Sequence, residues 1–137
     1  LVATQRGYMT IADIIDKAPP KIWSWNKDTK QDELVDIWEI KVVEHDNLYK
    51  VNNIILTEDH IMYTENNTPV SVNPTKAKEN YDKDSTKIVL GDRLMTKGGN
   101  LETVGYISPY SGTHTTYTIK TTLGNFYADG VLVDSEI

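Results

Sequence analysis

Apolar and polar residues alternate along most of this 137-residue chain, in short runs separated by turn-forming residues. Runs such as Ile54–Leu56 and Val131–Val133 have the length and β-branched composition of buried strands. Gly98–Gly99 and Asp129–Gly130 are typical turn sequences between strands. The pattern predicts a single all-β domain of about ten short strands, with at most one or two short helical turns.

The predicted strands cover most of the chain, and one segment near its start is predicted to be helical. That segment is 10–17, in which Thr10 caps the start and Pro19–Pro20 stops the element. Leu34, Ile37 and Ile40 also fit a helical spacing, so a helix remains an alternative to an extended 31–43. The strands are predicted at 1–4, 22–25, 31–43, 48–56, 61–63, 70–72, 87–90, 101–107, 115–121, 126–128 and 131–133.

Segment 73–86 differs from the rest of the chain in composition. It holds Pro74, three lysines and few apolar residues. Such a segment buries little apolar surface, which is typical of an exposed excursion from a domain. We therefore expect 73–86 to be a polar, exposed loop, with a helical turn at 76–79 as an alternative within it.

Composition and charge exclude several functions. The net charge of −6 argues against non-specific binding to nucleic acid or to an anionic membrane surface. The absence of cysteine excludes disulfides and thiolate metal sites, so a nucleophile in this chain must be a hydroxyl. Three histidines without cysteines have no zinc-ligand spacing, so we expect no metal site. No signal peptide or membrane-spanning run is visible, which predicts a soluble domain.

The bend between the predicted strands 54–56 and 61–63 is the candidate site. It brings the Thr57 hydroxyl and the His60 imidazole close together, and His60 is the only histidine flanked by core-forming residues. His45 and His114 are predicted in a turn and an exposed loop. By itself, the pair at the bend is consistent with two polar groups satisfied in a turn beneath the core.

Four stretches together resemble the conserved blocks of a known family. Leu1–Ile15 contains a strand, a glycine turn and an Ile-x-x-Ile segment, and Leu56–His60 contains Thr-x-x-His. Val89–Leu94 contains a Gly-Asp turn, and 116–133 resembles the closing pair of blocks. In this order and spacing they resemble the Hint domain of inteins and Hedgehog proteins. The resemblance implies a horseshoe of short strands with pseudo-twofold hairpins, excised from or inserted in a longer chain.

The resemblance also implies a chemistry. In the family, a first-residue Cys or Ser attacks the preceding carbonyl and converts a peptide bond to a thioester or ester. On this chain, His60 would protonate the departing nitrogen and Thr57 would bind the strained amide. Asp59 is set aside, because successive strand residues point to opposite faces. The substrate would be the chain's own flanking polypeptide in a single-turnover reaction, without a cofactor.

Departures from the family pattern limit this chemistry. The family's nucleophile falls several residues before Leu1, and Thr118 and Gly124 replace an Asp and a His found in many members. The pair Asp134 and Ser135 replaces the terminal His-Asn, and a serine cannot form the succinimide that releases the C-terminal flank. We therefore expect N-terminal cleavage without complete splicing. The alternatives are an inactive Hint fold acting as a structural or protein-interaction module, and an unrelated β-barrel or β-sandwich that binds a protein.

Overall fold

The computed structural model describes residues 1–17 and 21–135, and β-strands dominate these ranges. The predicted stop at Pro19–Pro20 lies outside the described residues. The helices are α1 (Ile11–Lys17), α2 (Pro74–Tyr81) and the 3₁₀-helix η1 (Glu65–Asn67). The strands are β1 (Val2–Thr4), β2 (Gly7–Met9), β3 (Ile22–Asn26), β4 (Gln31–Val35), β5 (Ile37–His45), β6 (Leu48–Val51), β7 (Ile54–Thr57), β8 (Met62–Thr64), β9 (Thr68–Ser71), β10 (Thr86–Lys87), β11 (Arg93–Met95), β12 (Leu101–Thr103), β13 (Ile107–Tyr110), β14 (His114–Thr121), β15 (Asn125–Ala128) and β16 (Val131–Asp134).

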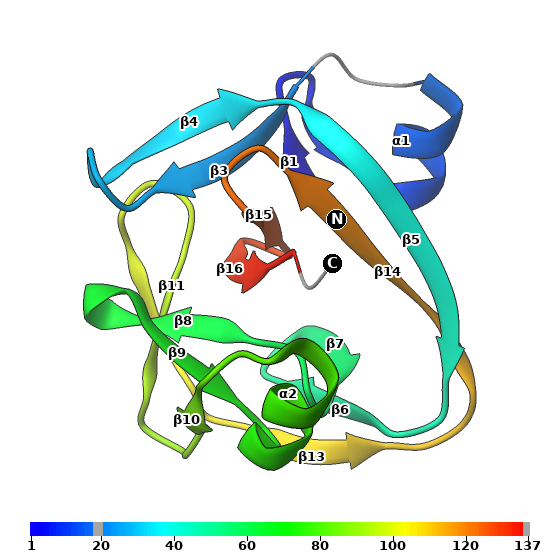
Figure 1. Cartoon of the computed structure of the whole chain (residues 1–137), viewed down its shortest axis with the longest axis vertical. Coiled ribbons are helices and arrows are strands. Elements are labelled where there is room, and N and C mark those ends of the chain that lie inside the picture. Colours follow the sequence, from blue (N-terminus) through cyan, green and yellow to red (C-terminus); the bar gives the residue numbers. More distant parts are fainter. Residues whose placement is uncertain (18–20, 136–137) are drawn as a thin grey trace.

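The strands form three sheets around one core. The largest has the path β10-β9-β8-β16-β15-β1-β3-β4, and β2, β11 and β12 pair onto it. The smaller sheets are β13-β6-β7 and the two-stranded ribbon β14-β5. In Figure 1 the β15–β16 hairpin lies in the middle of the molecule, and β5 and β14 run side by side along one edge. The all-β prediction is confirmed, although the strands are more numerous and shorter than expected.

The central hairpin carries much of the core. β15 lies between β1 and β16, and β16 also pairs with β8 through Val133 and Met62. All four residues of β16 are buried. The hairpin bends at Asp129–Gly130, where both residues have positive φ angles of 49° and 83°. Glycine adopts such a conformation without the steric penalty of a Cβ, as the sequence predicted for this turn.

The predicted helix at 10–17 is confirmed. α1 begins after Thr10, whose Oγ1 accepts a hydrogen bond from Asp13 N at 3.2 Å. Ile14 is the buried residue of α1. The extended alternative for 31–43 is also confirmed, because this range forms β4 and most of β5 with a break at Asp36. Neither α-helix in the described residues has the length and apolar character needed to cross a membrane.

Segment 73–86 is not a loop throughout, contrary to prediction, but the alternative of a helical turn at 76–79 is confirmed. It contains α2 and the first residue of β10. Asn73 caps α2 by accepting a hydrogen bond from Lys76 N on its side-chain oxygen at 3.2 Å, and Pro74 occupies the first helical turn. Ala77 is fully buried and holds the helix to the domain. One small buried residue leaves little apolar periodicity, which is why the composition alone indicated an exposed loop.

Other strand boundaries also differ from the prediction. The range 48–56 is a hairpin of β6 and β7, because Asn52 adopts a φ of 51° between them. The predicted loop after Ile107 contains β13, which pairs along β6 despite Pro109. The predicted strand 87–90 is wrong beyond Lys87, because Val89 and Leu90 are exposed.

Candidate functional site

The Thr57–His60 bend is a closed turn between β7 and β8. His60 N donates a hydrogen bond to Thr57 O at 3.1 Å. Leu56 and Ile61, on the two sides of the turn, are only 4% and 2% exposed. The apolar anchors therefore fix the turn against the core and hold its two polar side chains in place.

A hydrogen-bond chain links the turn to α2. Thr57 Oγ1 donates to Asp59 Oδ1 at 2.7 Å, and Asn80 Nδ2 of α2 donates to Asp59 Oδ2 at 2.7 Å. A second link joins Asn73 N to Glu58 O at 2.8 Å. Asp59 was set aside by strand alternation, but this rule does not apply because residues 58–59 form a turn. Sequence reasoning also missed Asn80, because this residue lies one position beyond the helical turn considered at 76–79.

His60 is buried and joined to the far end of the chain. Its Nε2 lies 3.0 Å from Asp134 O, and this carbonyl oxygen can only accept, so Nε2 carries the proton. Burial lowers the pKa of His60 below its ordinary value of 6.5, while the charges of Asp134 and Asp59 oppose this shift. The imidazole is therefore neutral at pH 7 and donates one ring proton to the Asp134 carbonyl.

Asp134 and Ser135 are both buried at the end of β16. Tyr63 OH donates to Asp134 Oδ1 at 2.8 Å, and Lys83 forms an ion pair with the other carboxylate oxygen. Ser135 N donates to Gly124 O at 2.9 Å. The structure thus brings the two predicted pairs, Thr57 with His60 and Asp134 with Ser135, into one region. Lys83 and Tyr63 were not predicted there, because their contact with Asp134 is long-range.

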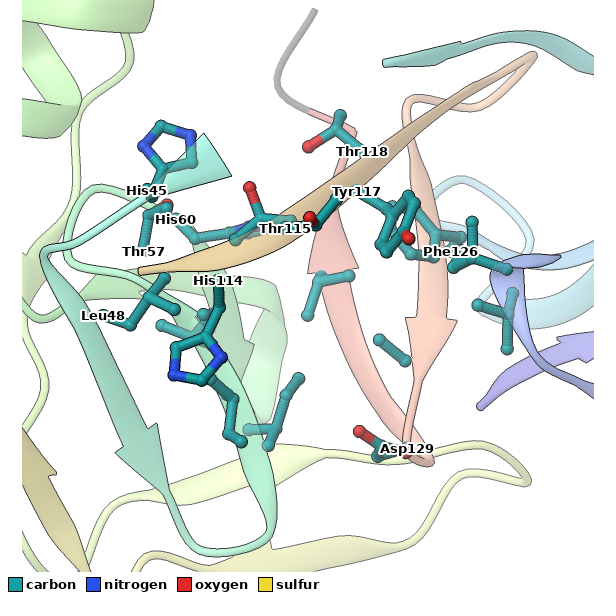
Figure 2. A pocket seen from close by; sticks show the side chains of 18 of the residues that line it. His45, Leu48, Thr57, His60, His114, Thr115, Tyr117, Thr118, Phe126 and Asp129 are labelled. Atoms are coloured by element: carbon teal, nitrogen blue, oxygen red, sulfur yellow. The ribbon is translucent and has the colours of Figure 1, made fainter. Parts of the chain in front are cut away.

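A cavity of about 330 Å³ adjoins the turn. Figure 2 shows β14 crossing it, with Thr57 and His60 toward one side and Phe126 toward the other. Leu1 also lines it, and the terminal nitrogen of Leu1 donates to Asp129 Oδ1 at 2.8 Å. The N-terminal end of the described chain therefore lies at the same cavity as His60.

Two more histidines line this cavity without forming a recognisable metal site. His45 and His114 are cross-strand partners at the far ends of β5 and β14. His114 Nε2 lies 3.0 Å from Ser111 O, and the predicted exposed position of His114 is confirmed. In residues 1–17 and 21–135, no group of three or more His, Asp or Glu side chains could hold a metal ion.

The arrangement of strands is the Hint fold found in inteins, as comparisons with solved structures show. The chain is 17% identical to a DnaB intein from Synechocystis, with a TM-score of 0.73 over 100% of this chain and 94% of that one. It is 19% identical to a bacterial intein-like domain from Clostridium thermocellum, with a TM-score of 0.72 over 98% and 92%. For a DnaX mini intein from Spirulina platensis the values are 20%, 0.71, 98% and 94%. No protein-family model matches the sequence, and no curated protein matches it significantly.

These likenesses confirm the fold that the four sequence blocks predicted. They extend over almost the whole of this chain and of each intein compared. The alternative of an unrelated β-barrel or β-sandwich is therefore wrong. At these identities the likeness establishes the fold, and the chemistry must be argued from the side chains.

Proposed function

We propose that this domain processes its own backbone by an N-terminal acyl shift followed by cleavage, without complete splicing. The observation that carries the proposal is a buried, neutral His60 at a cavity that Leu1 also lines. A chain segment preceding Leu1 would enter or pass this cavity. Its scissile peptide bond would then lie within reach of the turn that holds His60.

His60 is the proposed general acid and base. A neutral imidazole can take a proton on one nitrogen and release one from the other, so it can pass a proton from an attacking hydroxyl or thiol to the departing nitrogen. Burial favours this role, because it keeps the pKa of His60 low and the ring uncharged near neutral pH.

Thr57 is the proposed positioning residue for the scissile amide. Its hydroxyl proton is donated to Asp59 Oδ1, so its oxygen is oriented to accept a hydrogen bond from an amide N–H. Asn80 in turn holds Asp59 at 2.7 Å. This chain of contacts supports a fixed acceptor at the cavity wall, which is what positioning a substrate requires.

We do not propose complete splicing, because the residues at the end of β16 do not support the succinimide step. The succinimide route needs an asparagine side-chain amide as nucleophile, and Ser135 has none. Asp134 also replaces the histidine that assists this step in the family. The substrate of the proposed reaction is the flanking polypeptide, and each molecule reacts once.

The test is to express the polypeptide as its gene encodes it, including the residues before Leu1, and to measure cleavage by intact-mass spectrometry. We expect a fragment released upstream of Leu1, at a rate raised by added thiol or hydroxylamine. H60Q should slow cleavage by roughly 100-fold or more, as loss of a general acid–base group does. T57V should slow it less and T57S should restore it.

A matched control is T29V, because Thr29 is an exposed threonine in the β3–β4 turn. Its cleavage rate should equal that of the wild type. An intact wild-type chain that also resists thiol and hydroxylamine would rule out the proposed activity.

The second candidate is a catalytically inactive Hint fold that serves as a structural or interaction module. It is favoured by the contacts of Asp134, whose carboxylate is held by Tyr63 and Lys83 as a structural group would be. The residue several positions before Leu1 discriminates the two candidates, since a Cys or Ser there favours cleavage. Under the inactive candidate, size-exclusion chromatography of the encoded protein should show altered assembly when residues 1–137 are deleted.

A further inference from the structure

The hydroxyl of Ser135 is the one buried side-chain polar group without a hydrogen-bond partner among the described residues. Ser135 is 4% exposed, so water does not satisfy the hydroxyl freely. Buried hydroxyls are almost always paired, because an unpaired one keeps its desolvation cost. An orphaned nucleophilic atom in a candidate self-processing domain therefore calls for a chemical explanation.

The peptide bond that precedes Ser135 is held at both of its polar atoms. Its carbonyl oxygen, Asp134 O, receives the Nε2–H of His60 at 3.0 Å. Its nitrogen, Ser135 N, donates to Gly124 O at 2.9 Å. A donor at this distance from a carbonyl oxygen is the arrangement that stabilises the oxyanion of an acyl-transfer intermediate. The low pKa of His60 keeps the donor neutral, and the buried surroundings strengthen its effect.

We propose that Ser135 is the nucleophile of a second self-processing reaction, an N→O acyl shift at the Asp134–Ser135 bond whose carbonyl His60 holds. Ser135 Oγ attacks the carbonyl carbon of Asp134, and the negative charge develops on Asp134 O against the His60 N–H. The C–N bond then breaks, and the Oγ proton ends on the nitrogen. The product is an ester between the Asp134 acyl group and Ser135 Oγ, with a free α-amino group on Ser135.

Water completes the reaction. It adds to the ester carbonyl and releases Asp134 as a new C-terminal carboxylate and Ser135 as a new N-terminus with its hydroxyl restored. No other reactant is needed. This route does not require the succinimide that Ser135 cannot form, so it gives C-terminal release by a different bond-breaking step.

The surroundings favour Ser135 over the Asp134 side chain as the nucleophile. The two carboxylate oxygens of Asp134 are engaged by Tyr63 and Lys83, and these contacts restrain the group and lower its electron density. The Ser135 hydroxyl, by contrast, has no hydrogen-bond partner in the described part of the chain. The reaction shares His60 with the proposed N-terminal cleavage but needs no residue before Leu1.

The test uses the purified chain 1–137 at neutral pH with hydroxylamine, followed by intact-mass and peptide analysis. We expect fragment 1–134 with a C-terminal hydroxamate and the tripeptide 135–137, because hydroxylamine intercepts the ester. S135A should abolish both products. S135C should give a thioester that added thiol cleaves faster than the serine ester. H60Q should slow release by roughly 100-fold, the effect of removing one oxyanion donor.

Three controls separate this reaction from others. S111A removes an exposed hydroxyl and should leave the rate unchanged. Hydroxylamine can also cleave Asp129–Gly130 after succinimide formation, but that fragment ends at residue 129 and is distinguished by mass. Circular dichroism and thermal unfolding show whether S135A and H60Q remain folded, and S135G serves as a second variant without the hydroxyl if S135A does not fold.

The outcomes are decisive in either direction. A folded wild-type chain that stays intact in hydroxylamine overturns the proposal, as does equal cleavage of S135A or cleavage only at residue 129. Equal rates for H60Q and the wild type overturn the role of His60. A failure of the cleavage upstream of Leu1 does not affect this test, because the fragments measured here come from the Asp134–Ser135 bond.

Discussion

The β15–β16 hairpin and the β5–β14 ribbon are both antiparallel pairs of strands, but their surroundings differ. β16 has four buried residues and pairs with β15 and β8, whereas β5 has no buried residue and pairs only with β14. Regular backbone pairing therefore does not determine which strands form the core. The hairpin holds the Asp134 carbonyl that His60 binds, and the ribbon supplies the wall of the cavity. Asp134 lies in the buried strand β16, whereas residues 114–118 of β14, which line the cavity, are exposed or half-buried.

The largest predicted effect on stability comes from truncating a buried side chain of the hairpin. Leu132 is fully buried in β16, so Leu132→Ala should reduce the free energy of unfolding by about 3 kcal/mol. Val42 lies in the ribbon and is 51% exposed, so Val42→Ala should change it by about 0.5 kcal/mol or less. Urea denaturation of both variants measures the difference. Equal losses would contradict the comparison.

The next effect concerns Tyr127, the buried cross-strand partner of Leu132 in the same hairpin. Tyr127 OH of β15 donates to Asp32 Oδ1 of β4 at 2.5 Å, and burial followed by this contact raises the pKa of Tyr127, so the phenol stays protonated. Tyr127→Phe should cost about 2 kcal/mol, as for other hydrogen bonds to charged groups. One residue beyond the end of β14, Thr122→Val removes the acceptor of the exposed Trp38 Nε1–H of β5 and should cost far less. Thermal unfolding of the two variants tests this, and similar losses would refute it.

A smaller effect should appear with pH. Because burial lowers the pKa of His60, the unfolded chain binds a proton below pH 6.5 that the folded chain resists. The stability from the neutral ring is present above pH 6.5 and falls as the pH drops, by at most about 1.4 kcal/mol per pH unit, until the folded His60 also protonates. Asp134, Asp59 and Lys83 are the charged groups that act on the ring.

The measurement is a series of urea titrations between pH 5 and 8 on the wild type and H60Q. The wild type should lose stability with decreasing pH below 6.5, and H60Q should lose less. A ribbon variant, H45Q, is the matched control because its imidazole is outside the buried turn. Identical pH slopes for the wild type and H60Q would contradict the assignment.

The smallest effect is expected for the largest side chain of the ribbon. Trp38 lies in β5 and is 64% exposed. Trp38→Ser should cost about 1 kcal/mol or less, although truncating a buried tryptophan costs about 3–5 kcal/mol. Lys120 Nζ lies 5.8 Å from the Trp38 ring centroid and contributes part of the small loss. Chemical denaturation checks this, and a loss above 3 kcal/mol would contradict the exposed position of Trp38.

Local sequence signals predicted the features that depend on neighbouring residues. Asp129–Gly130 between two apolar runs identified the central hairpin, and Thr10 with Ile14 identified α1. The Thr57–His60 bend was found because polar residues interrupt two buried runs. Each of these signals lies within a few residues of the element it predicts.

Features with a weak local signal, or with none, were missed. Asn52 adopts a left-handed conformation just after β6. Asparagine adopts this conformation more often than most residues, but its presence alone does not predict it, so 48–56 was predicted as one strand. α2 buries only Ala77, although Asn73 and Pro74 were usable capping signals. Lys83 contacts Asp134 across 51 positions, and no local pattern indicates such a pair.

The hydrogen bond between His60 and Asp134 spans 74 positions of the sequence, and the strand that ends at Asp134 lies between two others. During synthesis, residue 60 leaves the ribosome well before residue 134, so the site stays incomplete while most of the chain is already free to fold. For the self-processing reactions proposed above, the order of translation would set the earliest moment of reaction. A nascent chain could not cut itself before its final strand had been made and inserted, and unfinished molecules would thereby be protected from premature cleavage.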